Sequence, residues 1–475
     1  MLRSYLQLVA IGLAVGLLAS ATRTSAAERP NFVLLMADDQ GWGDVAYNGN
    51  ADLKTPVLDE MARTALRLER FYAAAPVCSP TRGSVLTGRH PNRFGCFSWG
   101  YMLRPEEITL AEVLKEAGYA TGHFGKWHLG PVAADVPNSP GTSGFDQWFS
   151  SPNFYENSPL MSANGKVVKT DGEGSQVTVA AALEFIRAAA NSERPFLAVV
   201  WFGSPHLPHQ ALEADREPYA SHPPAMQNYW GEITAMDRAI GKLREELRKL
   251  DIADNTLVWY TSDNGATTPG STGGLRGKKG SVWEGGLRVP AIVEWPARIK
   301  SPRTSSLPAG TVDILPTVLE LAGASVPKDR PLDGVSLKPL IDGQMTRRDQ
   351  SLGFWVYPAP GKPVRSQEIL AKLARVQAGE ADAEPEFEEP SQTRYSETEL
   401  PGHAAWIDGD FKLHRLPGKA GEFRYELYDL AADAKEETDL AAKHAGRVAA
   451  MKQQLADWQQ SVVQSLNRED YGEPK

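Results

Sequence analysis

Asn31-Phe32-Val33-Leu34-Leu35-Met36-Ala37 is a near-continuous apolar run, and the polar stretch Asp38-Asp39-Gln40-Gly41 follows it directly. An apolar run of this length is typical of a strand buried on both faces of a sheet. Residues 196–202 and 256–261 have the same character, and segments with helical periodicity lie between the runs. The alternation predicts an α/β fold in which a mostly parallel sheet lies between helices.

Local signals predict where several other elements begin and end. Thr55-Pro56 is typical of a helix start, and Thr109 with Glu112 forms a capping box for a helix that stops near Gly118. A long helix is expected over residues 229–250, and a fourth buried strand over residues 289–295.

The pattern of apolar and charged residues changes after about residue 345. Residues 366–390 are helix-like and then acidic, which is typical of a solvated surface insertion. Short strands at 404–407, 411–413 and 426–430, with an amphipathic helix over 441–463, predict a smaller antiparallel sheet plus helix. We therefore expect a main domain over residues 28–345 and a C-terminal subdomain over residues 346–475.

The first 27 residues have the features of a secretory signal peptide. Arg3 gives a positive start, residues 6–19 form a short apolar core, and Ser25-Ala26-Ala27 offers small residues for cleavage. The core is too short to span a bilayer comfortably. The sequence predicts an exported protein, periplasmic or secreted, with no stable membrane association.

Composition limits the classes of partner. The 475 residues carry a formal net charge of -9 and show no basic stripe, which argues against nucleic acid as the main partner. A local basic pocket for an anion is compatible with this balance. Of the two cysteines, Cys78 and Cys96 could pair in an exported protein. If Cys78 has another role, Cys96 is single and we expect it to be buried.

Two polar pairs follow predicted strands. Asp38-Asp39 follows the first strand, and Asp263-Asn264 follows the strand over residues 256–261. Sites in open α/β sheets form outside the carboxyl ends of strands, so we expect the pairs to meet there. Carboxylate and amide oxygens suit a hard divalent cation, with Ca²⁺ favoured. Each pair alone is more often a turn.

The stretch Val77-Cys78-Ser79-Pro80-Thr81-Arg82-Gly83 reads as a helix start. Ser79 suits an N-cap and Pro80 suits the first turn, and the helix would run toward Gly88. Cys78 would lie at the positive end of the helix dipole, and Arg82 adds fixed positive charge, so the segment favours an anion. A buried, inert residue is the usual fate of a lone cysteine.

This stretch resembles the signature of the sulfatase family, in which a Cys-x-Pro-x-Arg core is read by a maturation enzyme that oxidises the cysteine to formylglycine. The resemblance implies an alkaline-phosphatase-like sandwich with a smaller C-terminal sheet. It also implies that one divalent cation, Ca²⁺, is bound by Asp38, Asp39, Asp263, Asn264 and an oxygen of modified Cys78.

Three further segments are similar to the family: residues 125–130, 204–209 and 275–286. Looser similarity continues at residues 406–413 and 427–430. Within residues 275–286 two lysines are adjacent, so Lys278 stays an alternative to Lys279. The resemblance implies catalytic roles for Cys78, Arg82, Lys126, His128, His206 and Lys279, and substrate contacts for Lys126, His206, His209 and Lys279.

The implied mechanism uses the hydrate of the formylglycine aldehyde as the nucleophile that attacks sulfur. Arg82 and the cation activate it, while Lys126, Lys279 and the cation hold the sulfate oxygens. His206, with Lys279, protonates the departing oxygen, and His128 then takes a proton from the second hydroxyl.

The resemblance implies a sulfuric ester hydrolase that removes sulfate from a sulfated carbohydrate or an aryl sulfate. Its partners would be a sulfated glycan or small sulfate ester and, during maturation, the formylglycine-generating enzyme. The nearest alternative is a phosphonate or phosphodiester hydrolase of the same superfamily. An inactive glycan-binding protein is a third interpretation, but it predicts a damaged catalytic set, and this sequence has none.

Overall fold

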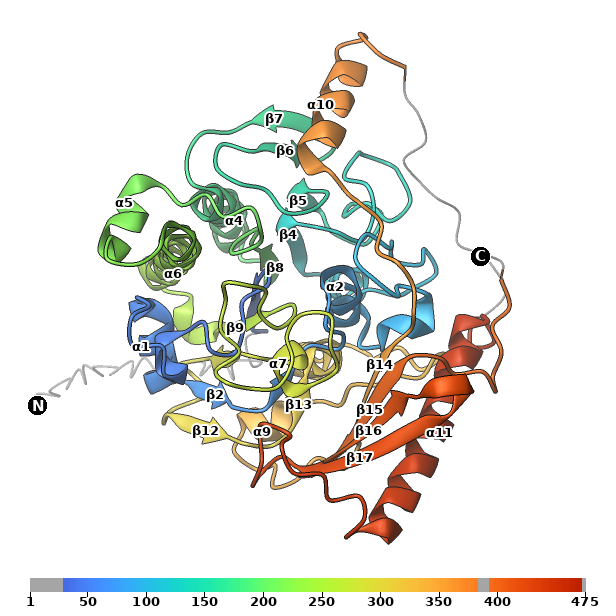
Figure 1. Cartoon of the computed structure of the whole chain (residues 1–475). Coiled ribbons are helices and arrows are strands. Elements are labelled where there is room, and N and C mark those ends of the chain that lie inside the picture. The colour runs from blue at the N-terminus through green and yellow to red at the C-terminus, as the bar shows by residue number, and fades with distance from the viewer. Residues whose placement is uncertain (1–28, 383–392, 472–475) are drawn as a thin grey trace, which may run out of the picture.

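The computed structural model describes residues 29–382 and 393–471, so the predicted signal peptide lies outside the described residues. Its centre is a sheet with ten strands within that part of the chain, in the order β12-β2-β11-β9-β1-β8-β4-β5-β6-β7 (Figure 1). These strands are β1 (Asn31–Ala37), β2 (Leu66–Leu68), β4 (Ala120–Lys126), β5 (Gln147–Ser151), β6 (Leu160–Ala163), β7 (Lys166–Lys169), β8 (Phe196–Trp201), β9 (Thr256–Ser262), β11 (Ile292–Glu294) and β12 (Arg303–Ser305).

The middle of this sheet is parallel, as the sequence predicts. Strands β9, β1, β8, β4 and β5 run in the same direction. Ala37 is level with Ser262 in the pairing of β1 with β9. Strands β11, β6 and β7 pair antiparallel with their neighbours. The level ends of β1 and β9 place the residues that follow them side by side.

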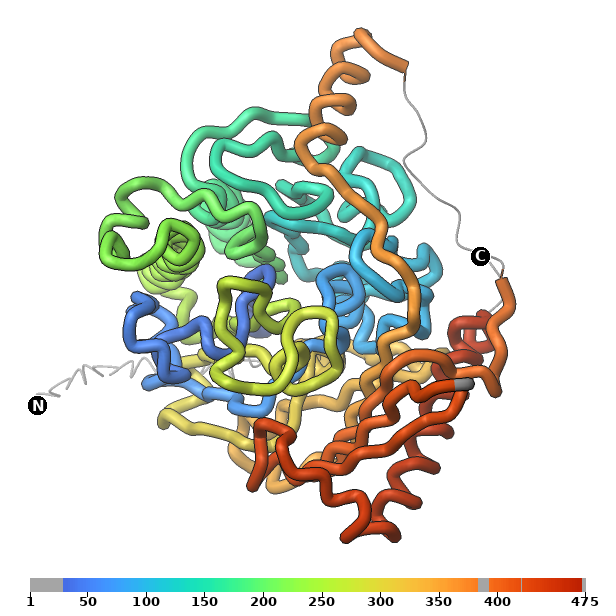
Figure 2. Tube along the Cα trace, in the orientation of Figure 1, coloured from blue at the N-terminus to red at the C-terminus, as the bar shows by residue number. Residues whose placement is uncertain are grey.

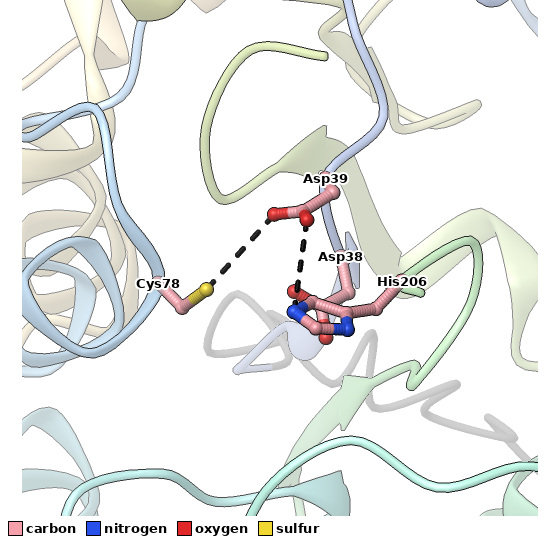
Figure 3. A group of neighbouring side chains, drawn as sticks. All are labelled: Asp38, Asp39, Cys78 and His206. Atoms are coloured by element: carbon pink, nitrogen blue, oxygen red, sulfur yellow. Dashed lines mark hydrogen bonds and ion pairs between the residues drawn. The ribbon is translucent and has the colours of Figure 1, made fainter. Parts of the chain in front are cut away.

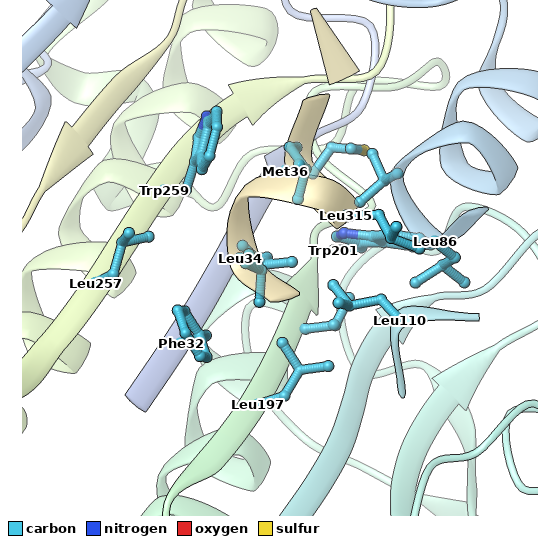
Figure 4. Close-up of a cluster of buried hydrophobic side chains, with 14 of the residues drawn as sticks. Phe32, Leu34, Met36, Leu86, Leu110, Leu197, Trp201, Leu257, Trp259 and Leu315 are labelled. Atoms are coloured by element: carbon cyan, nitrogen blue, oxygen red, sulfur yellow. The ribbon is translucent and has the colours of Figure 1, made fainter. Parts of the chain in front are cut away.

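Both faces of the sheet are buried, because successive side chains of a strand point to opposite faces. In β1, Phe32, Leu34 and Met36 belong to one apolar cluster (Figure 4), and Val33 and Leu35 belong to the other. The first cluster is covered by α2 (Cys78–Thr87), α3 (Leu110–Glu116), α8 (Ile314–Ala322) and α9 (Lys338–Ile341). The second is covered by α1 (Pro56–Thr64), α4 (Gly174–Asn191) and α6 (Pro224–Lys249).

Most local predictions are confirmed, and one strand is not. Thr109 and Glu112 make the predicted capping box, with Glu112 N donating to Thr109 Oγ1 at 3.1 Å. The prediction of one continuous strand over residues 289–295 is wrong. It divides at Pro290 into β10 (Arg288–Val289), which pairs with β3 (Phe71–Tyr72), and β11 of the main sheet. Proline has no N–H for a ladder and fixes its own φ.

The predicted C-terminal sheet is present and has one more strand than expected. It pairs antiparallel in the order β14-β15-β16-β17, and α11 (Ala445–Leu466) covers its outer face (Figure 2). Its inner face packs on the main body, where Phe354 and Ile407 join Tyr72 and Leu287 in one cluster. The strands are β14 (Leu352–Val356), β15 (His403–Asp408), β16 (Phe411–Pro417) and β17 (Phe423–Asp429).

The remaining elements are short, apart from α10 (Ser366–Gln377), which occupies the first part of the predicted insertion. The acidic residues from 383 onward in that insertion lie outside the described residues. The short elements are α5 (Glu213–Arg216), α7 (Glu284–Leu287), β13 (Ala309–Gly310), η1 (Ala46–Asn48), η2 (Pro91–Phe94), η3 (Glu217–Tyr219), η4 (Ala253–Asn255), η5 (Thr311–Asp313) and η6 (Lys419–Gly421). Within the described residues, no helix combines the length and the apolar character needed to cross a membrane.

Asp333 joins the main body to the C-terminal helix α11. Its carboxylate accepts hydrogen bonds from the Arg93 guanidinium at 2.7 and 2.9 Å and from His90 N at 2.6 Å. Trp458 Nε1, on α11, donates to the same carboxylate at 2.8 Å. Burial alone would raise the pKa of Asp333, but the Arg93 charge and these hydrogen bonds hold it well below its usual range.

We predict that Asp333→Asn lowers the free energy of unfolding by about 3 kcal/mol at pH 7, because Arg93 is left buried without its counter-charge. A carboxylate with a depressed pKa stabilises the fold above its unfolded pKa and loses that contribution as pH falls toward the folded value. The deficit of the variant should therefore shrink below about pH 4. Urea unfolding of both proteins at several pH values measures this.

Asp349→Asn is the matched control, since Asp349 makes an exposed ion pair with Arg347. Exposed pairs contribute about 0.5 kcal/mol or less. Equal deficits in the two variants, or a deficit of Asp333→Asn that is constant with pH, would contradict this account of Asp333.

Candidate active site

The carboxyl ends of β1 and β9 bring the two polar pairs together. Asp38 and Asp39 follow β1, Asp263 and Asn264 follow β9, and all of these side chains are buried. Asp39 N donates to Asp263 Oδ1 at 3.1 Å, and Asp263 N donates to Ala37 O at 3.2 Å. Asp39 adopts a φ of 66°, a left-handed conformation that aspartate tolerates better than most residues. The predicted meeting of the pairs is confirmed.

Cys78 lies on helix α2, which begins two residues earlier than expected. Val77 is the N-cap, and Cys78 is the first residue of the helix. The prediction that Ser79 caps the helix is therefore wrong; its Oγ accepts from Gly100 N at 2.9 Å instead. Pro80 still fits, because the first N–H groups of a helix have no partner within it. The helix ends at Gly88 with a φ of 69°, as predicted.

Cys78 lies within the polar cluster and is almost inaccessible. Its Sγ is 3.4 Å from Lys279 Nζ and 3.9 Å from Asp39 Oδ1. Burial raises the pKa of the Cys78 thiol to about 12, although nearby Lys126 and Lys279 lower it. A thiol with such a pKa is protonated at neutral pH and is a poor nucleophile. Cys96 is buried and unpaired with Cys78, as the sequence predicts.

Arg82 is completely buried beneath the cluster and fixes Asp263. Its Nε and Nη2 donate to Asp263 Oδ2 at 3.1 and 2.7 Å, and its Nη1 donates to Lys126 O at 3.1 Å. The guanidinium also lies over the Trp201 ring. These bonds make Arg82 a link between α2, β4 and the end of β9.

Two lysines reach the cluster, Lys126 from the end of β4 and Lys279 from a loop. Lys126 Nζ donates to Asp38 Oδ2 at 2.7 Å. Lys279 Nζ donates to Asp39 Oδ1 and Oδ2 at 2.5 and 2.7 Å. Lys278 is exposed. Of the two lysines that the sequence leaves open, Lys279 is therefore the one within the site.

The neighbouring charges shift the pKa values of Asp38 and Asp263 in opposite directions. Burial alone would raise the pKa of Asp38, but Lys126, His206 and Arg82 outweigh it and hold the pKa well below its usual range. Burial and the neighbouring Asp38 charge raise the pKa of Asp263 to about 7 in spite of Arg82. Basic groups thus stabilise the charge of Asp38, whereas burial and a neighbouring carboxylate oppose the charge of Asp263.

The donor set fits a hard cation. Asp38 Oδ1 and Asn264 Oδ1 are buried and accept no hydrogen bond from the described part of the chain. Asn264 Nδ2 donates to Asp39 Oδ1 at 2.8 Å, so its amide oxygen is the atom left over. One ligand atom each from Asp38, Asp39, Cys78 and His206 lies within 4.8 Å of the others (Figure 3). Buried oxygens without donors are what a divalent cation needs.

His206 lies at the edge of the cluster with one nitrogen available. Its Nδ1 is 2.6 Å from Leu207 O, and because a carbonyl only accepts, Nδ1 carries the proton. Its Nε2 is 3.7 Å from Asp39 Oδ2. Burial lowers the pKa of His206, although Asp38 and Asp39 oppose that shift. The ring stacks on Phe154, with the centroids 4.2 Å apart.

The other two predicted histidines have different surroundings. His128 lines the same cavity as Cys78, and neither ring nitrogen has a hydrogen-bond partner among the described residues. Burial lowers the pKa of His128 well below its usual value. His209 instead lies against Glu232, at 3.7 Å, and against the Tyr229 ring. It does not line the cavity that contains Cys78, so the structure does not bring it to the predicted substrate contact.

A cavity of about 470 Å³ opens above Cys78. Cys78, His128, His206 and Lys279 line its floor, and Trp99, Asn153, Phe154 and residues 363–368 form much of its wall. Sequence reasoning did not assign these wall residues to the site, because they lie in loops and at the start of α10, far along the chain from Cys78.

Comparison with known families gives a consistent result. The family described as Sulfatase matches residues 30–324. The family described as N-sulphoglucosamine sulphohydrolase, C-terminal, matches residues 277–372. The two matches together extend from the first strand into α10.

Relatives of known name agree with the family match. N-acetylgalactosamine-6-sulfatase of Canis lupus familiaris is 36% identical over 373 residues, covering 68% of each chain. Steryl-sulfatase of Rattus norvegicus is 32% identical over 424 residues, covering 68% of this chain and 72% of the relative. The solved structure of Ps i-CgsB in complex with k-i-k-neocarrahexaose superposes with a TM-score of 0.77 at 24% identity, covering 91% of this chain and 93% of that one. The geometry, the family match and these relatives lead to one conclusion, that the chain belongs to the sulfatase family and is a sulfuric ester hydrolase.

Proposed function

We propose that this enzyme removes sulfate from sulfated carbohydrates, using a formylglycine derived from Cys78 and one bound Ca²⁺. The observation that carries the proposal is the place of Cys78. It is the first residue of α2, it lies beneath the cavity, and it is within reach of Lys279 and the carboxylate cluster. A helix N-terminus surrounded by lysines favours a bound anion.

A protonated thiol is a poor nucleophile, so Cys78 would act only after its conversion to formylglycine. The modified residue would supply a hydroxyl of the aldehyde hydrate as the nucleophile. Pro80 and Arg82, which the maturation enzyme would read, are buried in the finished fold. We therefore expect the formylglycine-generating enzyme to act on the chain before it folds.

Asp38, Asp39, Asp263 and Asn264 would hold the cation, together with an oxygen of modified Cys78. Ca²⁺ is favoured because the donors are oxygens in an irregular arrangement, which this ion accepts more readily than Mg²⁺. When bound, the ion would neutralise charge on the sulfate and on the crowded carboxylates.

The remaining residues would bind the sulfate, orient the carboxylates and transfer protons. Lys126 and Lys279 donate hydrogen bonds to the sulfate oxygens, where fixed positive charge stabilises the transition state most. Arg82 orients Asp263 and adds positive charge beneath the nucleophile. His206 protonates the departing oxygen through Nε2, and neutral His128 accepts a proton from the nucleophile.

Two observations support a carbohydrate as the natural substrate. A relative is named N-acetylgalactosamine-6-sulfatase, and a protein of the same fold was solved in complex with k-i-k-neocarrahexaose. The cavity also offers aromatic surface beside the reacting groups, which suits a sugar ring. The features of residues 1–27 support export to the periplasm or the medium.

Cys78→Ala should abolish sulfate release, because the nucleophile of the proposed mechanism derives from this side chain. The measurement is release of sulfate from a panel of sulfated glycans and 4-nitrophenyl sulfate by enzyme co-expressed with the maturation enzyme. Phosphate diesters form a second arm of the panel. Release of phosphate without sulfate would show that the enzyme is a phosphonate or phosphodiester hydrolase. If the wild type releases neither sulfate nor phosphate, a binding protein is favoured.

Lys279→Ala should lower kcat/KM for a sulfate ester by about a hundredfold, because it removes a preorganised donor to the sulfate. Lys278→Ala is the matched control, since the adjacent side chain is exposed and should change kcat/KM by less than about twofold. The reverse order of effects in steady-state assays would show that Lys278 is the active lysine.

Removal of the cation should lower both activity and stability. After dialysis against a chelator, we expect Ca²⁺ at a hundred times its Kd to raise the free energy of unfolding by about 2.7 kcal/mol. Asn264→Ala should weaken Ca²⁺ binding by about tenfold or more, because it deletes one ligand. Calorimetric titration and thermal unfolding test this, and an unfolding temperature insensitive to Ca²⁺ would contradict the assignment.

A further inference from the structure

A segment of the C-terminal part crosses the mouth of the active-site cavity. Residues 357–365, here called the strap, leave β14 of the C-terminal sheet and run to α10 on the far side of the main body (Figure 2). The end of the strap and the start of α10 line the cavity opposite Cys78. One wall of the active site therefore comes from outside the parallel sheet.

The strap is held against the main body by hydrogen bonds. Lys362 N donates to Trp99 O at 2.9 Å. Asn153 Nδ2 donates to Val364 O at 3.0 Å, and Asn153 N donates to Ser366 Oγ at 2.9 Å. Two loops of the main body thus hold the second half of the strap, which lines the cavity.

Helix α10 is fixed in the same manner to the edge of the main sheet. Gln367 Oε1 accepts from Leu160 N at 2.9 Å. Gln377 Oε1 accepts from Val167 N at 3.1 Å, and its Nε2 donates to Gly165 O at 2.6 Å. These side chains satisfy backbone groups around the β6–β7 hairpin, so the start of α10 has a defined position at the cavity.

Trp99 presents aromatic surface at this wall. Its side chain lines the cavity and is 37% exposed, which is unusual for so large an apolar group. The indole rests on the strap at Gly361, where an added Cβ would lie 1.9 Å from Trp99 Cε2. Only glycine allows this close approach. The strap therefore supports an indole that remains partly exposed at the cavity, an arrangement suited to stacking on a sugar ring.

Arg365 places a cation at the same wall. Its side chain is 73% exposed and lines the cavity, and its partner Glu368 is 70% exposed at 3.3 Å. An exposed pair of this kind is worth about 0.5 kcal/mol, so the guanidinium can exchange Glu368 for a ligand at little cost. The planar guanidinium matches a sulfate or carboxylate with two parallel hydrogen bonds.

We infer that Trp99 and the strap form a subsite for a sugar unit beside the scissile ester, and that Arg365 selects glycans with a second anionic group. The inference rests on the proposed function and names its substrate class, an acidic oligosaccharide. The cavity of about 470 Å³ is in the range of sites for organic ligands of drug size, so it holds more than the sulfate. A second sulfate and a uronic carboxylate share the chemistry that Arg365 recognises.

The test compares matched oligosaccharides that share one scissile sulfate and differ in a neighbouring group, which is neutral, sulfated or a carboxylate. For Arg365→Gln we expect kcat/KM to fall about tenfold on the dianionic substrates, mainly through KM, and to change less than about twofold on the neutral one. Arg365→Lys should recover part of the loss, because it restores the charge without the planar fork. The sulfated and carboxylated arms show which anion is preferred.

Trp99→Ala should lower kcat/KM on all the oligosaccharides by about tenfold, and by a smaller factor on 4-nitrophenyl sulfate. Arg347→Gln is the control, because Arg347 is 83% exposed in a pair away from the cavity. Equal losses on neutral and dianionic substrates would overturn the role of Arg365, and equal losses on glycans and aryl sulfate would overturn that of Trp99. A wild type active on aryl sulfate but on no oligosaccharide would overturn the subsite alone. A wild type that releases sulfate from neither the aryl sulfate nor any oligosaccharide would overturn the proposed function and the subsite with it.

Discussion

The ion pair between Arg82 and Asp263 is the constraint on which the active site depends. Both side chains are fully buried, so each would be costly without the other. Asp263 in turn accepts from Asp39 N, and Arg82 donates to the carbonyl of Lys126. One buried contact thereby sets the relative positions of α2 and the carboxyl ends of three strands. Contacts within the protein itself therefore hold Cys78, the carboxylates and Lys126 together.

The same arrangement supports the proposed cation. The strand ends bring the carboxylates of Asp38, Asp39 and Asp263 together in a region that excludes water. Arg82 is occupied by Asp263, and the two lysines are occupied by the other carboxylates. A substrate sulfate would draw the lysines away, and the carboxylates would then repel each other and the sulfate. A divalent cation among the oxygens resolves both conflicts, because it offsets the negative charge on each side.

The sequence predicted those features that depend on neighbouring residues or on a repeated pattern. Strands such as β1 are apolar on both faces, and the polar pairs directly after them mark the edge where the site forms. Predictions were wrong where a single residue, or a partner distant in the sequence, determines the local structure. Pro290 divides a continuous apolar run, and α2 begins at Cys78, two residues before the start expected from a cap at Ser79. The wall of the cavity was missed because Trp99 meets Gly361 only in the folded chain.

The C-terminal sheet belongs to the active site physically, although it lies far from it in the sequence. Lys279 lies in a loop between Arg276 and Glu284, and Gly285 N donates to Arg276 O at 2.7 Å to close that loop. Lys412, from β16, is buried and donates to Glu284 Oε1 at 2.9 Å. Arg276 donates to Tyr428 Oη, on β17, at 3.1 Å, and to the backbone carbonyl of Glu436 at 3.0 Å. The sheet thus holds both ends of the loop that carries an active-site lysine, and its first strand leads into the strap. Loss of its packing would therefore disturb the position of the reacting groups and the shape of the cavity together.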